Sequence, residues 1–128
     1  YAMVDLIDYN VGRMVAALNE TEQLNNTIVI FMSDHGEMLG DHGIYLKGPH
    51  FYEEAVRVPL IFSWPGQFKT GLKVDGLTEL IDITPTLLDA AGLSIPQFIQ
   101  GKTLLPILSG KANPNHHRNS VFSEYYNA

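Results

Sequence analysis

The chain contains no cysteine in its 128 residues. This absence excludes disulfide bonds, thiolate metal ligands and a cysteine nucleophile within the chain, and it says nothing about redox compartment. Positive charge is also scarce, because eight Lys and Arg stand against fourteen Asp and Glu, for a net charge of −6. Without a basic cluster, binding along a phosphate backbone is not expected, so nucleic acid is excluded as a partner.

Long hydrophobic runs are missing as well. No apolar stretch approaches the roughly 20 residues that span a bilayer, so no membrane span is expected. Residues 1–5 lack the pattern of a signal peptide and read as an internal start, which leaves open a signal sequence upstream. The composition, with 45% hydrophobic and 17% charged residues, is that of a globular protein rather than a disordered one.

Apolar residues near the N-terminus recur at three- and four-residue steps, the spacing of an amphipathic helix. They are Val4, Ile7, Val11, Met14 and Leu18. Two continuous apolar runs, 27–32 and 58–64, then predict strands covered on both faces, with Met32, Phe62 and Trp64 in the core.

A second helix is expected over residues 80–91, with Pro85 near its start and Gly92 as its C-cap. After it we expect a short turn around residues 104–108 and a further strand that begins at Val121. This alternation predicts an α/β fold. Residues 1–92 form its sheet portion, and residues 93–128 form a loop-rich segment that leads toward a C-terminal subdomain.

The tripeptide Asp34-His35-Gly36 directly follows the first predicted strand. Active sites of open α/β sheets tend to lie at the carboxyl ends of strands, and the turn allowed by Gly36 can bring both side chains to one ion. Carboxylate and imidazole together suit a divalent cation, with Mn, Zn or Fe favoured over Ca or Mg. Asp and His also commonly cap turns, so the tripeptide alone leaves a structural role open.

Lys47 and His50 follow in the same Gly-rich loop, which also contains a second Asp-His-Gly at residues 41–43. A lone loop lysine is usually a solvated charge. Beside a metal and an anionic substrate, its ammonium would instead stabilise negative charge on the reacting group.

Several ordered motifs resemble the later half of the sulfatase family, within the alkaline-phosphatase-like superfamily. They are residues 26–43, Lys47-Gly48, residues 52–61, the Asp-x-x-Pro-Thr segment at 82–86 with its continuation to Gly92, and residues 122–125. The resemblance spans essentially the whole chain. It implies part of a mostly parallel sheet with flanking helices, taken from the C-terminal portion of a single catalytic domain.

The resemblance implies roles for matching positions. Asp34 and His35 occupy a late pair of metal ligands, and the metal is then usually Ca, with Mn, Mg and Zn as alternatives. Lys47 occupies the position of a catalytic lysine that contacts the sulfate group, and His50 is a candidate substrate contact. The second Asp-His-Gly is expected to shape the loop.

The activity implied is hydrolysis of sulfate esters of carbohydrates or aryl groups. It requires a formylglycine nucleophile from a Cys/Ser-x-Pro-x-Arg motif, which is expected outside this chain. Residues 63–67 copy that motif only superficially, because Gln67 replaces the arginine. The chain alone is therefore expected to be inactive, and its open sheet edge favours self-association.

Two alternative functions remain, a phosphonate monoester or phosphodiester hydrolase of the same superfamily and a non-catalytic sulfatase-like binding protein. The resemblance favours a periplasmic, secreted or lysosomal location, and no motif in the chain fixes one.

Other charged residues are expected to be structural. Arg57 is expected to pair with Glu53 or Glu54. A helix-start cap and a solvated helix face account for Asp82 and Asp89, and the pair His116-His117 is expected to be surface polar rather than a metal site.

Overall fold

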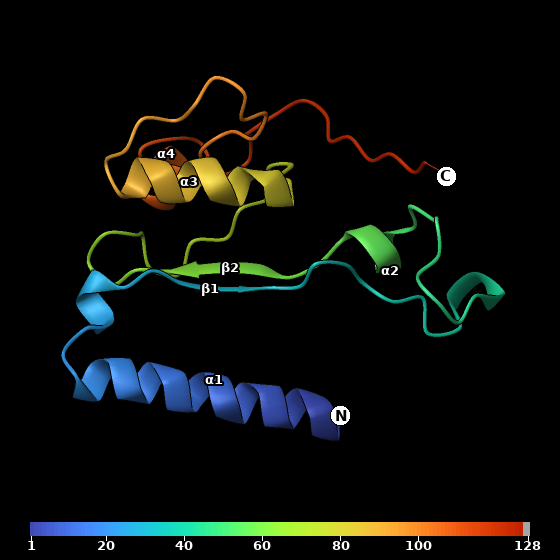
Figure 1. The fold of residues 1–128 in the computed structure, drawn as a ribbon, viewed down its shortest axis with the longest axis horizontal. Coiled ribbons are helices and arrows are strands. Elements are labelled where there is room, and N and C mark those ends of the chain that lie inside the picture. Colours follow the sequence, from blue (N-terminus) through green and yellow to red (C-terminus); the bar gives the residue numbers. More distant parts are fainter. Residues whose placement is uncertain (127–128) are drawn as a thin grey trace.

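The computed structural model describes residues 1–126. Its two-stranded sheet lies between the N-terminal helix on one side and the last two helices on the other (Figure 1). The α-helices are α1 (Ala2–Glu20), α2 (Glu53–Val56), α3 (Ile83–Ala90) and α4 (Leu105–Leu108), the strands are β1 (Val29–Met32) and β2 (Leu60–Ser63), and the 3₁₀ turns are η1 (Leu24–Asn26), η2 (Asp41–Gly43) and η3 (Leu80–Asp82). Among the described residues no helix is both long and apolar enough to cross a membrane.

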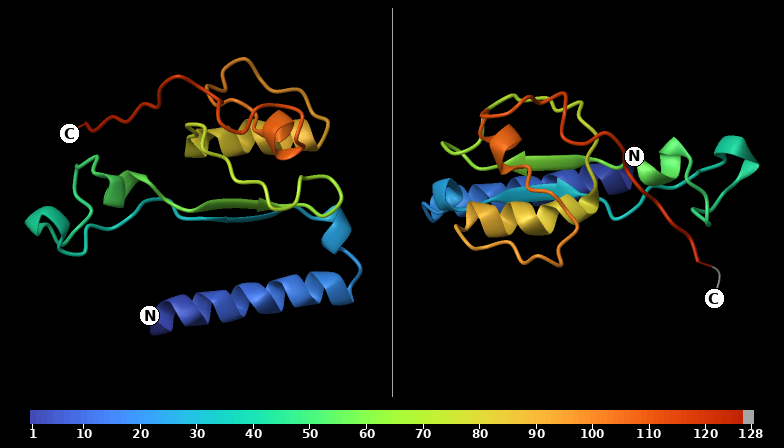
Figure 2. Two further views of the ribbon diagram at one scale, coloured as in Figure 1. Left: turned by 180° about the vertical axis from the view of Figure 1, so that it is seen from behind. Right: turned by 90° about the horizontal axis from the view of Figure 1, so that it is seen from above.

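The predicted N-terminal helix is confirmed as α1, which extends two residues further at each end than the apolar spacing indicated. It stands apart from the sheet (Figures 1 and 2). None of its described residues is buried. Met3, Ile7 and Met14 are exposed, whereas Val11, Val15 and Leu18 are half-buried. The apolar face of the helix is therefore only partly covered.

The two predicted strands form, but they pair antiparallel, with Val29 opposite Ser63 and Met32 opposite Leu60. The mostly parallel sheet expected from the sequence is therefore not what the described strands make. The connection between them explains the difference. Parallel neighbours are usually joined by a helix that crosses the sheet, whereas residues 33–59 contain only η2 and the four-residue α2 and return the chain antiparallel beside β1.

Both strands are more exposed than predicted. Phe31, Met32 and Ile61 are exposed, so the expectation of strands covered on both faces is wrong for this chain, as is the placement of Met32 in the core. Phe62 and Trp64 are half-buried. Trp64 packs edge-on against Phe68 and donates its indole N–H to the Asn25 carbonyl at 3.0 Å.

The helix predicted over 80–91 is observed as η3 continuing into α3. Pro85 lies in the first turn of α3, where a backbone N–H has no partner within the helix, so its absence costs little. Gly92 adopts φ +71°, the Gly92 N–H donates to the Asp89 carbonyl and the Leu93 N–H to the Leu88 carbonyl. These bonds form the Schellman motif that the C-cap prediction anticipated.

The later segment is mostly irregular, as expected, and α4 confirms the predicted turn around residues 104–108. The strand predicted from Val121 is wrong within the described part of the chain, since residues 121–126 form no ladder. Apolar, β-branched residues favour a strand only where a neighbouring strand offers hydrogen-bond partners. Here the segment runs past α4 toward the side of the molecule that carries α2 (Figure 2).

Few apolar side chains among the described residues are buried, and they are Met38, Ala55, Pro85, Leu104 and Ile107. Buried polar residues are prominent beside them: Asp82, Thr86 and His117. Self-association through the open sheet edge stays a prediction.

Three expectations for charged residues change. Asp82 does cap η3, because its carboxylate accepts the Glu79 N–H at 2.9 Å, but it is fully buried. Asp89 is half-buried and accepts a hydrogen bond from Thr103 at 2.8 Å, so it does not lie on a solvated face. His116 is exposed as expected, whereas His117 is buried against Asp82. Arg57 pairs with Glu53 at 3.2 Å, as predicted.

Candidate metal and anion site

The backbone just beyond β1 turns sharply around Asp34 and His35. Ser33 Oγ donates to the His35 carbonyl at 2.7 Å, and the His35 N–H donates to Asp34 Oδ1 at 3.0 Å. The Gly36 N–H then donates to the Ala55 carbonyl at 2.8 Å, which ties the turn to α2. Short polar side chains next to a glycine favour such local bonds over continuation of a strand.

This turn brings the two predicted ligands together. Asp34 Oδ2 lies 3.6 Å from His35 Nε2, and the Asp34 side chain is 81% exposed. His35 Nδ1 lies 2.8 Å from the Gly36 carbonyl. A carbonyl only accepts, so Nδ1 carries the proton and Nε2 presents its lone pair beside the carboxylate.

An oxygen and a nitrogen lone pair placed side by side fit one divalent cation, and the bond from Nδ1 to a carbonyl is the usual outer-sphere support of a metal-binding histidine. The described residues contain no group of three or more His, Asp or Glu side chains that could hold a metal. As predicted ligands, Asp34 and His35 would supply only two positions of a metal site, and a complete site would need further ligands.

The electrostatics of Asp34 favour its ionised form. The His35 backbone N–H lowers the pKa of the Asp34 carboxyl, and the Lys47 ammonium adds a smaller lowering. A carboxylate that is already ionised binds a cation without first losing a proton.

Gly36 is needed where the turn approaches α2. A Cβ at this position would overlap the Glu54 carbonyl, lying 2.8 Å from its carbon and 3.2 Å from Ala55 Cα. These are backbone atoms that cannot move aside separately. Glycine is thus required for close approach, independently of its φ angle.

Gly36→Ala is expected to destabilise the fold by about 2–4 kcal/mol, the combined cost of overpacking and of the Gly36–Ala55 hydrogen bond. Gly12→Ala is the matched control: nothing lies within 4 Å of its added Cβ, and within α1 it should stabilise by about 0.5–1 kcal/mol. Denaturant unfolding of both variants measures the difference. Equal stability of the two would show that the turn does not require glycine.

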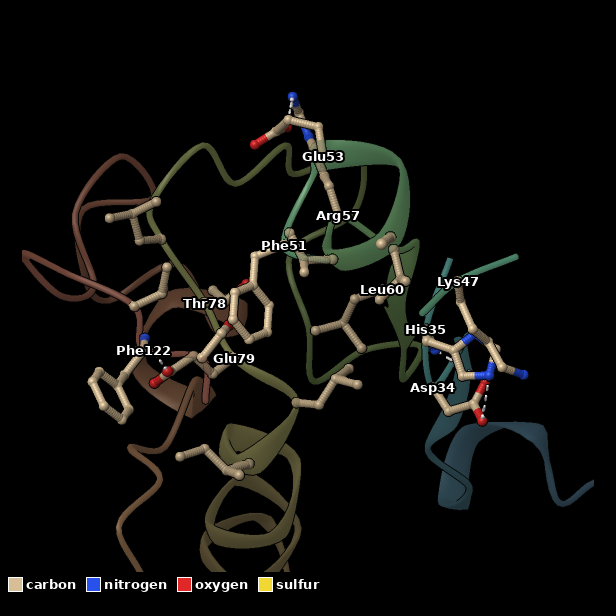
Figure 3. Close-up of a pocket in the computed structure, with 18 of the residues that line it drawn as sticks. Asp34, His35, Lys47, Phe51, Glu53, Arg57, Leu60, Thr78, Glu79 and Phe122 are labelled. Atoms are coloured by element: carbon tan, nitrogen blue, oxygen red, sulfur yellow. Dashed lines mark hydrogen bonds and ion pairs between the residues drawn. The ribbon is translucent and has the colours of Figure 1, made fainter. Parts of the chain in front are cut away.

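Asp34 and His35 line a hollow of about 1030 Å³, and Lys47 and His50 line it as well. Figure 3 shows Asp34, His35 and Lys47 on one side of this hollow, with Glu79 and Phe122 on the other. The structure thus brings together all four residues that the sequence singled out. Their individual roles stay predictions.

Other residues of the hollow were not anticipated. Arg57, Thr78, Glu79 and Phe122 line it from segments far apart in the chain. Arg57 was expected only as a partner of Glu53 or Glu54, and Phe122 was noted only as part of the motif at residues 122–125. No local pattern marks Glu79. Their shared position depends on contacts between segments far apart in the chain, which sequence spacing does not report.

The second Asp-His-Gly lies elsewhere. The His42 ring stacks on Tyr52, with ring centres 4.0 Å apart, and His42 Nε2 lies 3.8 Å from Glu54. Among the described residues that line the hollow, neither Asp41 nor His42 is present. This arrangement fits the expectation that the second motif shapes the loop.

Comparison with known proteins places the chain in a family. The sulfatase family model matches residues 1–93. The chain belongs to the sulfatase family.

Two sequence relatives illustrate the match. The chain is 41% identical over 128 residues to an arylsulfatase of Clostridium perfringens, covering 98% of this chain and 25% of that protein. It is 42% identical over 118 residues to human arylsulfatase K, covering 92% of this chain and 22% of that protein. The chain thus spans about a quarter of the length of the relatives it matches.

Two solved structures share its fold. One is phosphonate monoester hydrolase of Agrobacterium radiobacter, with a TM-score of 0.82 and 36% identity over 91% of this chain and 23% of that one. The other is described as a complex with its substrate D-glucosamine-2-N,6-O-disulfate, with a TM-score of 0.78 and 38% identity over 84% of this chain and 22% of that one. The described fold therefore matches a portion of the alkaline-phosphatase-like sulfatases.

Proposed function

We propose that this chain is the C-terminal portion of the catalytic domain of a metal-dependent sulfatase, and that the complete protein hydrolyses sulfate esters. The observation that carries the proposal is the gathering of Asp34, His35 and Lys47 around one hollow in a member of the sulfatase family. Two cation ligands beside an ammonium group form a suitable donor set for a bound anionic ester.

Each residue has a distinct role in this proposal. Asp34 and His35 hold a divalent cation, Ca by family resemblance, with Mn, Mg or Zn as alternatives. That cation would supply electrostatic stabilisation of negative charge on the ester. Lys47 donates hydrogen bonds to the sulfuryl oxygens, and His50 contacts the substrate from the same loop.

The chain supplies only part of the machinery. It contains no cysteine, and residues 63–67 lack the arginine of the nucleophile motif. We therefore place the formylglycine nucleophile and the remaining metal ligands outside these 128 residues, and we expect the chain alone to be inactive.

The substrate class proposed is a sulfated carbohydrate or an aryl sulfate. Support comes from the relatives, one named arylsulfatase and another solved with a disulfated glucosamine. The exposed, open position of Asp34 agrees with a substrate that enters from solvent.

A second candidate function is hydrolysis of phosphonate monoesters or phosphodiesters. It is favoured by the likeness to phosphonate monoester hydrolases, which reaches 41% identity for the enzyme from Silicibacter pomeroyi. Tetrahedral sulfuryl and phosphoryl groups both carry anionic oxygens, so the ligands and the lysine serve either reaction.

Turnover by the complete protein distinguishes the two candidates. We expect kcat/KM for an aryl sulfate to exceed that for an aryl phosphonate monoester by at least about tenfold, a difference of about 1.4 kcal/mol in transition-state binding. Faster phosphonate cleavage would establish the second candidate instead. Absence of both activities in a metal-loaded preparation would point to a non-catalytic homologue.

A further inference from the structure

A buried polar cluster lies at the start of α3, away from the predicted metal ligands. We call it the Asp82 cluster, and it consists of Glu79, Asp82, Lys102, His117 and Arg118. Asp82 and His117 are buried, and the side chains of Glu79 and Arg118 are only 17% and 16% exposed. Buried charges of this kind are stable only when paired and hydrogen-bonded.

Asp82 is the centre of the cluster. Its carboxylate accepts the backbone N–H groups of Glu79 at 2.9 Å and Lys102 at 2.8 Å, and it pairs with Arg118 Nη2. His117 Nε2 lies 3.3 Å away without a hydrogen bond. The carboxylate is thus satisfied from three chain segments, so its geometry is strongly constrained.

Arg118 connects this centre to the hollow. One end of its guanidinium, Nη2, pairs with Asp82, and the other, Nη1, pairs with Glu79. Glu79 in turn accepts the Phe122 N–H at 2.9 Å. Both Glu79 and Phe122 line the hollow that holds Asp34, His35 and Lys47.

The bridge depends on the shape of the arginine side chain. A guanidinium is planar, carries several fixed donors and can bind two carboxylates at once, whereas an ammonium is a compact point charge. A lysine at position 118 would keep the charge but would reach only one of the two carboxylates. The Glu79 carboxylate would then lose its anchor, and Phe122 would lose a fixed acceptor.

We propose that Arg118 is a positioning residue that fixes the wall of the hollow opposite the metal ligands. By holding Glu79 against Asp82, it fixes the backbone of residues 121–123 along that wall. Its effect on substrate binding rests on the proposed function, whereas its effect on the wall does not.

Hydrogen exchange tests the positional effect without any assay of activity. In the complete protein, Arg118→Lys should raise the exchange rate of the peptide covering residues 119–126 by roughly tenfold, because the Phe122 amide opens locally. The peptide covering residues 83–92 in α3 should be unchanged. Arg13→Lys is the matched control, since Arg13 is an exposed residue of α1 that hydrogen-bonds Asn10 and lies over the Tyr9 ring.

The kinetic effect is a second readout. Arg118→Lys should raise KM for a sulfate ester several-fold with a smaller change in kcat, since the wall contacts substrate away from the reacting group. Arg118→Gln should change exchange and KM further in the same direction, and if it fails to fold, Arg118→Lys decides alone. Unchanged exchange of residues 119–126 in Arg118→Lys would overturn the proposal, whether or not the protein is a sulfatase. Faster hydrogen exchange with an unchanged KM would show that Arg118 fixes the wall but does not affect substrate binding.

Discussion

Asp34→Ala in the complete protein is expected to lower kcat/KM for a sulfate ester by more than about 100-fold. Even the outer-sphere partners of metal ligands typically cost roughly 10–100-fold when they are removed, and Asp34 is proposed as a direct ligand. Its carboxylate is exposed beside the free lone pair of His35 Nε2 and lines the hollow. Because Asp34 has no buried partner, the variant should fold normally, and the loss should be one of function.

The second Asp-His-Gly provides a control within the same loop. Asp41→Ala removes the same side chain from the same tripeptide, but Asp41 does not line the hollow among the described residues. Its kcat/KM should stay within about threefold of the parent, as expected for a surface substitution. If Asp41→Ala lowered kcat/KM as much as Asp34→Ala, the activity would depend on the loop as a whole rather than on the Asp34–His35 pair.

Metal binding gives a readout that does not depend on turnover. A ligand at 100 times its dissociation constant stabilises the folded state by about 2.7 kcal/mol. The parent and Asp41→Ala should show this rise in stability when Ca is added, and Asp34→Ala should lose most of it. Retention of the full rise by Asp34→Ala would exclude Asp34 as a ligand.

Local sequence signals identified the parts of the fold that depend on local bonds. The apolar spacing of α1, the Gly92 C-cap and the turn at Asp34-His35-Gly36 are all governed by groups within about five residues of one another. Helix periodicity, a left-handed glycine and short polar side chains report such geometry directly. The core of the candidate site was therefore accessible from sequence.

Contacts between distant segments could not be predicted from local sequence patterns. Arg118 and Asp82 are 36 residues apart, and Phe122 and Glu79 are 43 apart. The sequence around His117 and Arg118 reads as a polar loop, because no periodic pattern marks a residue that is buried by a partner far along the chain. The prediction of a mostly parallel sheet was wrong for a related reason, because the direction of a strand depends on the path of the connection before it.

The sequence predicted too much burial for apolar runs that no other segment of this chain covers. Phe31, Met32 and Ile61 satisfy the pattern of covered strands but are exposed. The chain covers 22–25% of the length of two relatives, which are therefore about four times longer. A pattern of strands covered on both faces is expected of a fold larger than the one these residues form.

Lys47→Ala is expected to lower kcat by about 10²–10³-fold, the usual cost of removing one donor that stabilises developing negative charge. Lys47 lines the hollow on the same side as Asp34 and His35, and its charge contributes to the lowered pKa of Asp34. An ammonium group at this position would stabilise the negative charge that develops on the sulfuryl oxygens in the transition state. The loss should therefore fall mainly on kcat, with a smaller rise in KM.

Two further variants separate charge from geometry at this position. Lys47→Arg keeps the cation but changes its shape, so it should recover about tenfold or more of the lost kcat if charge dominates. Lys111→Ala removes an exposed lysine that does not line the hollow and should leave kcat unchanged. Steady-state kinetics with an aryl sulfate measure all three. A Lys47→Ala enzyme with parental kcat and raised KM would show that Lys47 binds ground state and transition state equally, and Lys47 would then be a binding residue rather than a catalytic one.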